Sequence, residues 1–266
     1  MQVNAVKLVY FSPTGATRKV LQNIAAGMQA VQVDEINLTP PDADSREIAQ
    51  LGHELTVIGM PVYAGRLPVQ AAARLRRLRG DHTPAVLVVV YGNRKYEDAL
   101  VELVDLSQAA GFVPVAGGAF IGEHSYTSAE KPLSAGRPDA DDLAQAAQFG
   151  KGIRTKLETI HSLEDLPPLV VPGNRPYKPL KPSDDITPET DEMLCTLCEC
   201  CMKVCPTAAI TINDRVETNA AKCIVCCACI KVCPTEARIM RDERVLKIAN
   251  WLYEDYAARK EPEIFL

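Results

Sequence analysis

Ten cysteines, the side chains in this chain best suited to bind metal or to form covalent bonds, all lie within residues 195–233. They form two similar runs, CTLCECCMKVCP at residues 195–206 and CIVCCACIKVCP at residues 223–234. Each run has the spacing C-x2-C-x2-C-x3-C-P, and a pattern that occurs twice intact does not arise by chance. The two runs therefore predict a shared function for the thiols.

Two familiar uses of clustered cysteines fit this chain poorly. Disulfide frameworks are typical of short secreted chains with a signal peptide. The N-terminal segment MQVNAVKLVYFS lacks the features of such a peptide, and 47% apolar residues are enough to build hydrophobic cores. A tetrahedral zinc site needs four ligands and gives no role to a third cysteine at a fixed offset. The spacing favours a multi-iron cluster.

The spacing of both runs resembles that of bacterial ferredoxins with two [4Fe–4S] clusters, in which the fourth cysteine of each run ligates the other cluster. This resemblance implies two ligand sets: Cys195, Cys198, Cys201 and Cys233, and Cys223, Cys226, Cys229 and Cys205. Cys200 and Cys227 are left over, either as small buried fillers or as alternative ligands or redox sensors. Glu199 and Cys227 stand where such loops usually have glycine, which leaves the loop conformation open.

Composition and charge narrow the function of the whole chain. The net charge is −5, from 29 basic and 34 acidic residues, so we expect no nucleic-acid partner. No apolar run approaches the length of a membrane-spanning helix, about 18 residues. Iron–sulfur clusters and free thiols are typical of a reducing compartment, so the expected location is the cytoplasm.

Residues 1–160 alternate between short apolar runs and segments with helical periodicity. In the first helical segment Val20, Ile24 and Met28 share one face. The expected strands cover residues 7–11, 31–38, 55–60, 85–91 and 112–122, and the expected helices cover residues 16–28, 68–78, 96–111 and 139–158. This alternation predicts the α/β class, with a doubly wound five-stranded parallel sheet whose ligands bind at the carboxyl ends of the strands.

The loop FSPTGATRK at residues 11–19 follows the first expected strand. Ser12, Thr14 and Thr17 supply hydroxyl groups, Gly15 allows a tight turn, and the N–H groups at the start of the next helix attract an anion. We interpret this loop as a phosphate site, although such turns also cap helices. It has neither the GxGxxG pattern of dinucleotide sites nor the GxxxxGK[ST] pattern of nucleoside triphosphate sites.

Two further loops follow the third and fourth expected strands, GMPVYAGRLP at residues 59–68 and YGNRKYED at residues 91–98. Tyr63, Tyr91 and Tyr96 lie in or beside them. Tyrosines at strand ends usually serve packing, but here they accompany a phosphate loop. Together the three loops predict a flat aromatic ring with a terminal phosphate, which is FMN.

The first 160 residues resemble a flavodoxin, whose S/T-x-T-G-x-T loop matches residues 12–17. The whole chain resembles the flavodoxin–ferredoxin fusion proteins. The resemblance implies that the loops after the third and fourth strands contact the flavin ring, and it does not say which tyrosine stacks on it. The candidate FMN contacts are Ser12, Thr14, Gly15, Ala16, Thr17, Pro61, Val62, Tyr63, Ala64, Gly65, Tyr91, Gly92, Asn93, Arg94 and Tyr96.

Composition divides the chain into four expected parts. Residues 1–160 form the flavodoxin-like FMN-binding domain, and residues 191–240 form a small α+β ferredoxin-like domain with two [4Fe–4S] clusters. Residues 161–190 are a proline-rich connector, either extended or lying as an ordered strap on one domain. Residues 241–266 form a helical tail that caps one of the modules.

A few other side chains have two possible interpretations. The arginines within residues 74–79 favour a solvated helix end over a docking patch. His124 follows the fifth strand and is either an ordinary loop residue or a catalytic proton donor. Arg66 and Arg94 either stabilise anionic reduced FMN or are ordinary surface arginines.

Three functions are compatible with these features, and no catalytic residue is assigned. The first is electron transfer between the two clusters and FMN, to or from a redox partner such as a ferredoxin or a reductase. The second is a ferredoxin-fed flavin reductase of a small acceptor such as a quinone, which requires an open pocket lined by His124, Tyr126 and residues 122–138. The third is a redox sensor that uses Cys200 or Cys227. The direction of electron flow and the oligomeric state are left open.

Overall fold

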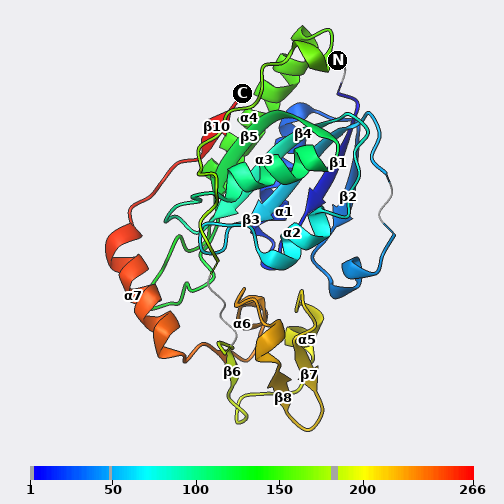
Figure 1. Ribbon diagram of the computed structural model, residues 1–266. Helices are drawn as coiled ribbons and strands as arrows, with labels where there is room; N and C mark the ends of the chain where they lie inside the picture. The colour runs from blue at the N-terminus through cyan, green and yellow to red at the C-terminus, as the bar shows by residue number, and fades with distance from the viewer. Residues whose placement is uncertain (1–2, 48–49, 181–184) are drawn as a thin grey trace.

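A computed structural model describes residues 3–47, 50–180 and 185–266 of the chain (Figure 1). The expected domain limits remain predictions, and their portions at residues 1–2, 48–49 and 181–184 lie outside the described residues. Among the described helices, none is long and apolar enough to cross a membrane.

The N-terminal part is built on a six-stranded sheet with the order β10-β5-β4-β3-β1-β2. The five parallel strands are β1 (Ala5–Tyr10), β2 (Gln32–Asn37), β3 (Leu55–Pro61), β4 (Thr83–Tyr91) and β5 (Phe112–Ile121). Their order, 2-1-3-4-5, is that of flavodoxin-like folds, and the strand order reverses between β1 and β3. The predicted doubly wound parallel sheet is confirmed.

Helices cover both faces of this sheet (Figure 1). They are α1 (Ala16–Met28), α2 (Val69–Leu75), α3 (Ala99–Ala109) and α4 (Ala140–Thr159). One apolar core joins the sheet to α1 and α4, and a second joins it to α2 and α3. All nine residues of β4 are buried, as expected for a central strand with helices on both faces.

Helices α1 and α4 approach each other closely because glycines lie at their contact. A Cβ atom at Gly27 would lie 1.9 Å from the carbonyl oxygen of Ala147, and one at Gly150 would lie 2.0 Å from that of Ile24. Any larger residue at these two positions would push the helices apart. The contact positions α1, whose N-terminus forms part of the candidate site.

The alternation of strands and helices fails at one place. Between β2 and β3 the described residues contain a short 3-10 turn, η1 (Pro41–Asp44), instead of a helix. The sheet also has a sixth strand that the sequence did not predict. Strand β10 (Glu263–Phe265) pairs antiparallel with β5 at the sheet edge, so the tail does not end as a helix.

The described part of the connector lies as a strap on the first domain. Asp98 accepts hydrogen bonds from the backbone N–H groups of Asn174 (2.8 Å) and Lys178 (2.7 Å). Arg175 forms an ion pair with Asp105, which also accepts a hydrogen bond from the Tyr177 hydroxyl. Of the two alternatives for the connector, these contacts favour the ordered strap.

The cysteine-rich module lies at the edge of the sheet where the parallel strands end (Figure 1). Its elements are β6 (Glu189–Thr190), α5 (Cys200–Lys203), β7 (Ile210–Ile212), β8 (Val216–Thr218), η3 (Ala220–Lys222), α6 (Ala228–Lys231) and β9 (Arg238–Ile239). A further 3-10 turn, η2 (Leu163–Asp165), precedes the strap. The chain then returns to the sheet through helix α7 (Glu243–Tyr256).

A single side chain holds much of this returning segment. Asn93, which is 3% exposed, donates hydrogen bonds to the carbonyl oxygens of Tyr256 (2.6 Å) and Ala258 (2.8 Å). Its own side-chain oxygen accepts a hydrogen bond from the backbone N–H of Lys260 (3.3 Å). The fourth strand's loop and the C-terminal tail therefore depend on each other.

We expect Asn93→Ala to lower the free energy of unfolding by about 1–3 kcal/mol, because buried backbone groups lose their partners. Trp251, the only tryptophan, lies in α7 and allows urea unfolding to be followed by fluorescence. Asn93 has a φ of 64°, so Asn93→Gly is the matched control that removes the side chain without backbone strain. An unchanged unfolding midpoint in both variants would contradict this role.

Candidate functional site

Four loops meet where the parallel strands end. A Cβ atom at Gly65, after β3, would lie 2.1 Å from the Glu97 carboxylate, and one at Gly92, after β4, would lie 2.3 Å from the His124 ring. A Cβ atom at Gly122, after β5, would lie 3.2 Å from Ala16 at the start of α1. The loops after β1, β3, β4 and β5 therefore form one continuous surface.

The first loop has the geometry of an anion site. Gly15 precedes α1 with a φ of 85°, a left-handed conformation that favours glycine, and its side-chain position has no atom within 4 Å. Ser12 Oγ accepts a hydrogen bond from the Arg18 N–H (3.1 Å), and Gly15 itself supplies no side-chain cap. The first N–H groups of the helix, at Ala16 and Thr17, have no intrahelical partners and suit a phosphate.

The three predicted tyrosines have different environments. Tyr91 and Tyr96 are 4% and 6% exposed and pack edge to face with ring centroids 5.5 Å apart. The Tyr96 hydroxyl also donates to Glu263 at 2.8 Å. Both rings belong to the core, so we assign only their backbone to the loop surface. Tyr63 is half-buried and hydrogen-bonds Ser125 of the fourth loop.

Arg66 and Arg94 have structural partners of their own. Arg66 forms two hydrogen bonds with the Glu102 carboxylate, at 2.7 and 2.9 Å, and its guanidinium lies 4.6 Å from the centre of the Tyr177 ring. Arg94 forms an ion pair with Glu97. Carboxylates thus neutralise both charges, which favours the interpretation of these arginines as structural loop residues.

His124 has the properties of a neutral, ordered loop residue. Burial, together with the nearby charges of Lys231 and Arg94, lowers the pKa of His124 to about 4. Its Nδ1 atom accepts a hydrogen bond from the Tyr126 N–H at 3.0 Å. A neutral imidazole near pH 7 is a poor proton donor, so this geometry favours the ordinary loop residue.

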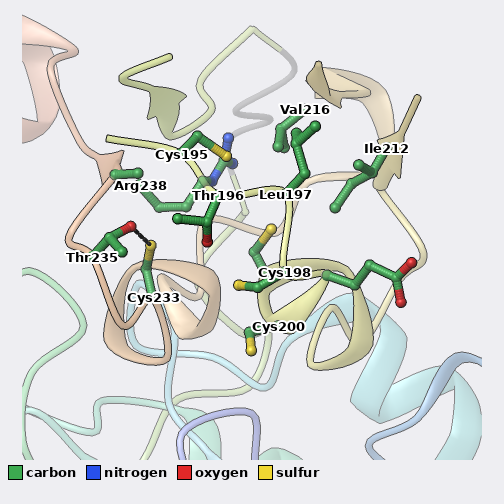
Figure 2. Close-up of a pocket in the computed structure, with 13 residues that line it drawn as sticks. Cys195, Thr196, Leu197, Cys198, Cys200, Ile212, Val216, Cys233, Thr235 and Arg238 are labelled. Carbon is green, nitrogen blue, oxygen red and sulfur yellow. Dashed lines mark hydrogen bonds between the residues drawn. The ribbon is translucent and has the colours of Figure 1, made fainter. Parts of the chain in front are cut away.

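The cysteines line two separate recesses. The first is lined by Cys195, Cys198, Cys201 and Cys233, and Figure 2 shows its side chains. The second is lined by Cys205, Cys223, Cys226 and Cys229. We call the first the distal recess and the second, which lies nearer to the loops of the sheet, the proximal recess. Each holds the four thiols of one implied ligand set, three from one run and one from the other.

The spare cysteines lie beside these sets. Cys200 lines the distal recess and Cys227 the proximal recess. Cys227 is 2% exposed, and its thiol contacts the Val225 carbonyl oxygen at 3.6 Å. Among the described residues, no three His, Cys, Asp or Glu side chains converge closely enough to hold a single metal ion.

Both cysteine loops share an unusual backbone. Glu199 and Cys227, the residues that stand in place of glycine, have φ values of 64° and 58°. Leu197 and Val225, at the equivalent positions before the second ligand, have φ values of 53° and 52°. The two runs therefore fold as structural repeats, and each accepts left-handed residues that cost about 1–2 kcal/mol apiece.

A buried positive charge lies between the two recesses. Arg238, in β9, lines the distal recess, and its Nη2 atom contacts the Cys229 sulfur of the proximal recess at 3.9 Å. It is 3% exposed, and its Nε atom has no hydrogen-bond partner within the described residues. A buried guanidinium beside thiol sulfurs fits a negatively charged group such as an iron–sulfur cluster held by thiolates.

The proximal recess adjoins the loop surface of the sheet. Burial, followed by the Cys226 and Cys227 sulfurs, raises the pKa of Tyr63 well above its usual value. Burial, followed by the Cys227 and Cys223 sulfurs, raises the pKa of Tyr126 to about 12. The hydroxyl groups of both tyrosines therefore lie close to the second cysteine run.

The sequence analysis did not predict several side chains that attach the cysteine module to the first domain. Lys231 forms an ion pair with Glu123 (2.5 Å), and Ile224 packs against the core formed with α2 and α3. Arg74, expected at a solvated helix end, is fully buried instead. It pairs with Asp44 and donates to the Pro206 carbonyl oxygen at 2.8 Å. The expectation was wrong for Arg74, which tertiary contacts cover, whereas Arg76, Arg77 and Arg79 are exposed as expected.

The family model of the 4Fe–4S binding domain matches residues 188–211, which contain the first cysteine run. No curated protein matches the chain.

Three flavodoxins are among the similar solved structures. One from the domain Archaea has 14% identity and a TM-score of 0.38, covering 58% of this chain and 99% of its own. One from Streptococcus pneumonia TIGR4 has 18% identity and a TM-score of 0.40, and the match covers 57% of this chain and 99% of that flavodoxin. A short-chain flavodoxin associated with a bacterial microcompartment has 15% identity and a TM-score of 0.41, and the match covers 58% of this chain and 98% of that flavodoxin.

The strand order and the family match together describe the chain. It combines a flavodoxin-like α/β domain with a 4Fe–4S binding segment, as the sequence predicted. Such a segment carries electrons, so the chain has a redox function and exchanges electrons with a partner.

The left-handed loop residues generate a test of the module. We expect Glu199→Val to release iron to a chelator several-fold faster than wild type, because a β-branched residue is strained at a φ of 64°. Glu199→Gly should release iron no faster than wild type, since glycine accepts this conformation. Equal rates for the valine and glycine variants would contradict the importance of this backbone geometry.

Proposed function

We propose that this protein transfers electrons between two [4Fe–4S] clusters and FMN, and exchanges them with a redox partner. The observation that carries the proposal is the contact between the proximal recess and the loops of the sheet. Tyr63 lies near Cys226 and Cys227, Tyr126 lies near Cys227 and Cys223, and Lys231 of the same run pairs with Glu123. When bound, the clusters would supply one-electron carriers and FMN a one- or two-electron carrier.

Two clusters are supported by the composition of the two recesses. Only the first run lies within the 4Fe–4S family match, but the second has the same spacing and the same backbone conformation. Each recess takes its fourth thiol from the other run, which is the exchange found in two-cluster ferredoxins. Cys195, Cys198, Cys201 and Cys233 would hold one cluster, and Cys223, Cys226, Cys229 and Cys205 the other.

FMN is supported by the loop from Ser12 to Thr17. The left-handed Gly15, the open space at its side-chain position and the free N–H groups of α1 suit a terminal phosphate. The residues from Pro61 to Gly65 and the backbone from Tyr91 to Arg94 would border the ring. Of the three predicted tyrosines, Tyr63 is the one whose ring lies outside the core clusters.

The two recesses differ in their access to partners. Cys198 of the distal recess is exposed, whereas Cys205, Cys226 and Cys229 of the proximal recess are each 8% exposed. A redox protein would therefore approach the distal recess, while the proximal recess lies between it and the loops. Joining both modules in one chain raises the effective concentration of each centre for the other.

The alternative functions receive less support. A flavin reductase needs an open pocket near His124 and Tyr126, but Tyr126 lies close to the second cysteine run. A thiol sensor that used Cys227 would need an accessible sulfur, and this one is buried. An electron carrier with a redox protein or a small molecule as its partner fits these contacts best, and the cytoplasm stays its expected location.

We expect the purified chain to contain FMN and not FAD, because the first loop suits a monophosphate and lacks a pyrophosphate pattern. Gly15→Val should weaken FMN binding at least tenfold, since a β-branched residue is strained at a φ of 85° and would obstruct the phosphate. Flavin is measured by mass after acid release and by fluorescence titration. Cluster absorbance should not change, and FAD in the wild-type protein would contradict the assignment.

The electron route is tested by removing one proximal ligand. We expect Cys205→Ala to damage the cluster held by Cys223, Cys226 and Cys229, and to slow flavin reduction by reduced methyl viologen to the rate of iron-free protein. Wild type should contain about eight irons in two clusters. Cys200→Ala, the matched control, should keep them.

Iron analysis, electron paramagnetic resonance and stopped-flow absorbance measure these outcomes. Wild-type protein with about four irons would contradict the second cluster. Unchanged flavin reduction in Cys205→Ala would contradict the route through the proximal recess.

A further inference from the structure

Arg238 differs from the two other buried arginines of the described residues, Arg74 and Arg137. Arg74 pairs with Asp44, and Arg137 pairs with Asp142, so each has a carboxylate partner. Arg238 is 3% exposed and forms no ion pair with any carboxylate in the described residues. It is therefore a buried cation whose counter-charge must come from another source.

The hydrogen bonds of Arg238 leave this charge uncompensated. Its Nη1 atom donates to the Thr190 hydroxyl (2.6 Å), and its Nη2 atom donates to the Thr218 hydroxyl (2.9 Å) and contacts the Cys229 sulfur (3.9 Å). The threonine oxygens orient the guanidinium but are neutral. Burying an unpaired ion costs several kcal/mol, so a negative group is needed nearby.

The fold does not require a charge at this position. Ala237 and Arg238 follow Cys233 just as Ala209 and Ile210 follow Cys205 in the first run. Ile210 is 4% exposed, and it serves the packing of its half of the module without any charge. Arg238 therefore breaks the symmetry of the two repeats and places one positive charge between the two recesses.

We propose that Arg238 raises the reduction potentials of both clusters, and that of the proximal cluster more. This inference rests on the proposed function. Reduction adds one electron to a cluster and breaks no bond, so its net charge becomes more negative. A fixed guanidinium stabilises the reduced form more than the oxidised form, and hydrogen bonds to cluster sulfurs act in the same direction. The Cys229 contact assigns the larger effect to the proximal recess.

The increase in potential that Arg238 causes opposes the difference in reduction potential that burial would create between the two clusters. Cys205, Cys226 and Cys229 are nearly inaccessible, whereas Cys198 is exposed. A buried site disfavours added negative charge, so burial alone would give the proximal cluster the lower potential. Electrons from a partner at the distal recess would then have to move uphill. Arg238 offsets this penalty and allows electrons to reach the loops of the sheet.

The test compares variants of the complete, cluster-loaded chain in anaerobic redox titrations followed by electron paramagnetic resonance. Arg238→Met removes the charge. Arg238→Lys keeps the charge but lacks the planar guanidinium that donates several hydrogen bonds at once. Arg241→Met removes an exposed charge near Glu189 and Asp191 and serves as the matched control. Cys198→Ser identifies the distal cluster by altering its signal.

In Arg238→Met we expect both midpoint potentials to fall, with the larger fall at the cluster whose signal Cys198→Ser leaves unchanged. Arg238→Lys should lie between this variant and wild type, and Arg241→Met should stay close to wild type. Shifts in Arg238→Met no larger than those in Arg241→Met would overturn the inference.

Iron content separates this inference from the proposed function. Wild-type protein without about eight irons refutes the two-cluster proposal, whereas eight irons with unshifted potentials refute only the role of Arg238. If Arg238→Met does not assemble its clusters, Arg238→Gln decides, because glutamine removes the charge but keeps a hydrogen-bond donor. A proximal potential equal to that of wild type in this variant would then overturn the inference.

Discussion

The contact between the second cysteine run and the loops at the end of the parallel strands is the interaction on which the rest of this structure depends. Those loops project from the end of the sheet and are not covered by its helices, so contacts with the cysteine module must hold them in place. The second run supplies Ile224 to the apolar core and places Cys226 and Cys227 beside the Tyr63 hydroxyl. This contact makes one redox unit of two modules.

The polar ties across this contact differ in strength. Lys231 and Glu123 are both partly exposed, and such an ion pair contributes about 1 kcal/mol or less. Arg74 is completely buried and bonds Asp44 as well as the carbonyl oxygens of Leu38, Thr39 and Pro206. Only the Pro206 bond crosses to the module, and the Asp44 side chain is 64% exposed, so its pairing with Arg74 is buried on one side only. The buried Arg74 bond to Pro206, the apolar contact of Ile224 and the Lys231–Glu123 pair together hold the module against the first domain.

The C-terminal tail completes the arrangement from the other side. Asn93 binds the end of α7, Arg137 donates to the Lys260 carbonyl oxygen at 2.9 Å, and β10 pairs with the edge of β5. Covering an edge strand removes a site for unwanted strand pairing. Because the tail leaves the cysteine module and returns to the sheet, both ends of that module are attached to the first domain.

The sequence alone determined the features that local spacing and periodicity encode. The apolar runs predicted all five parallel strands, and the cysteine spacing predicted which thiols line each recess. The anion site at the Gly15 loop stays a prediction. The tertiary structure decided the features that depend on partners distant in the chain. The burial of Arg74, the core positions of Tyr91 and Tyr96, the added strand β10 and the unpaired charge of Arg238 all arise from such contacts. The physical reason is that a residue's type and spacing describe its local preferences, whereas its burial and charge balance depend on neighbours that folding brings together.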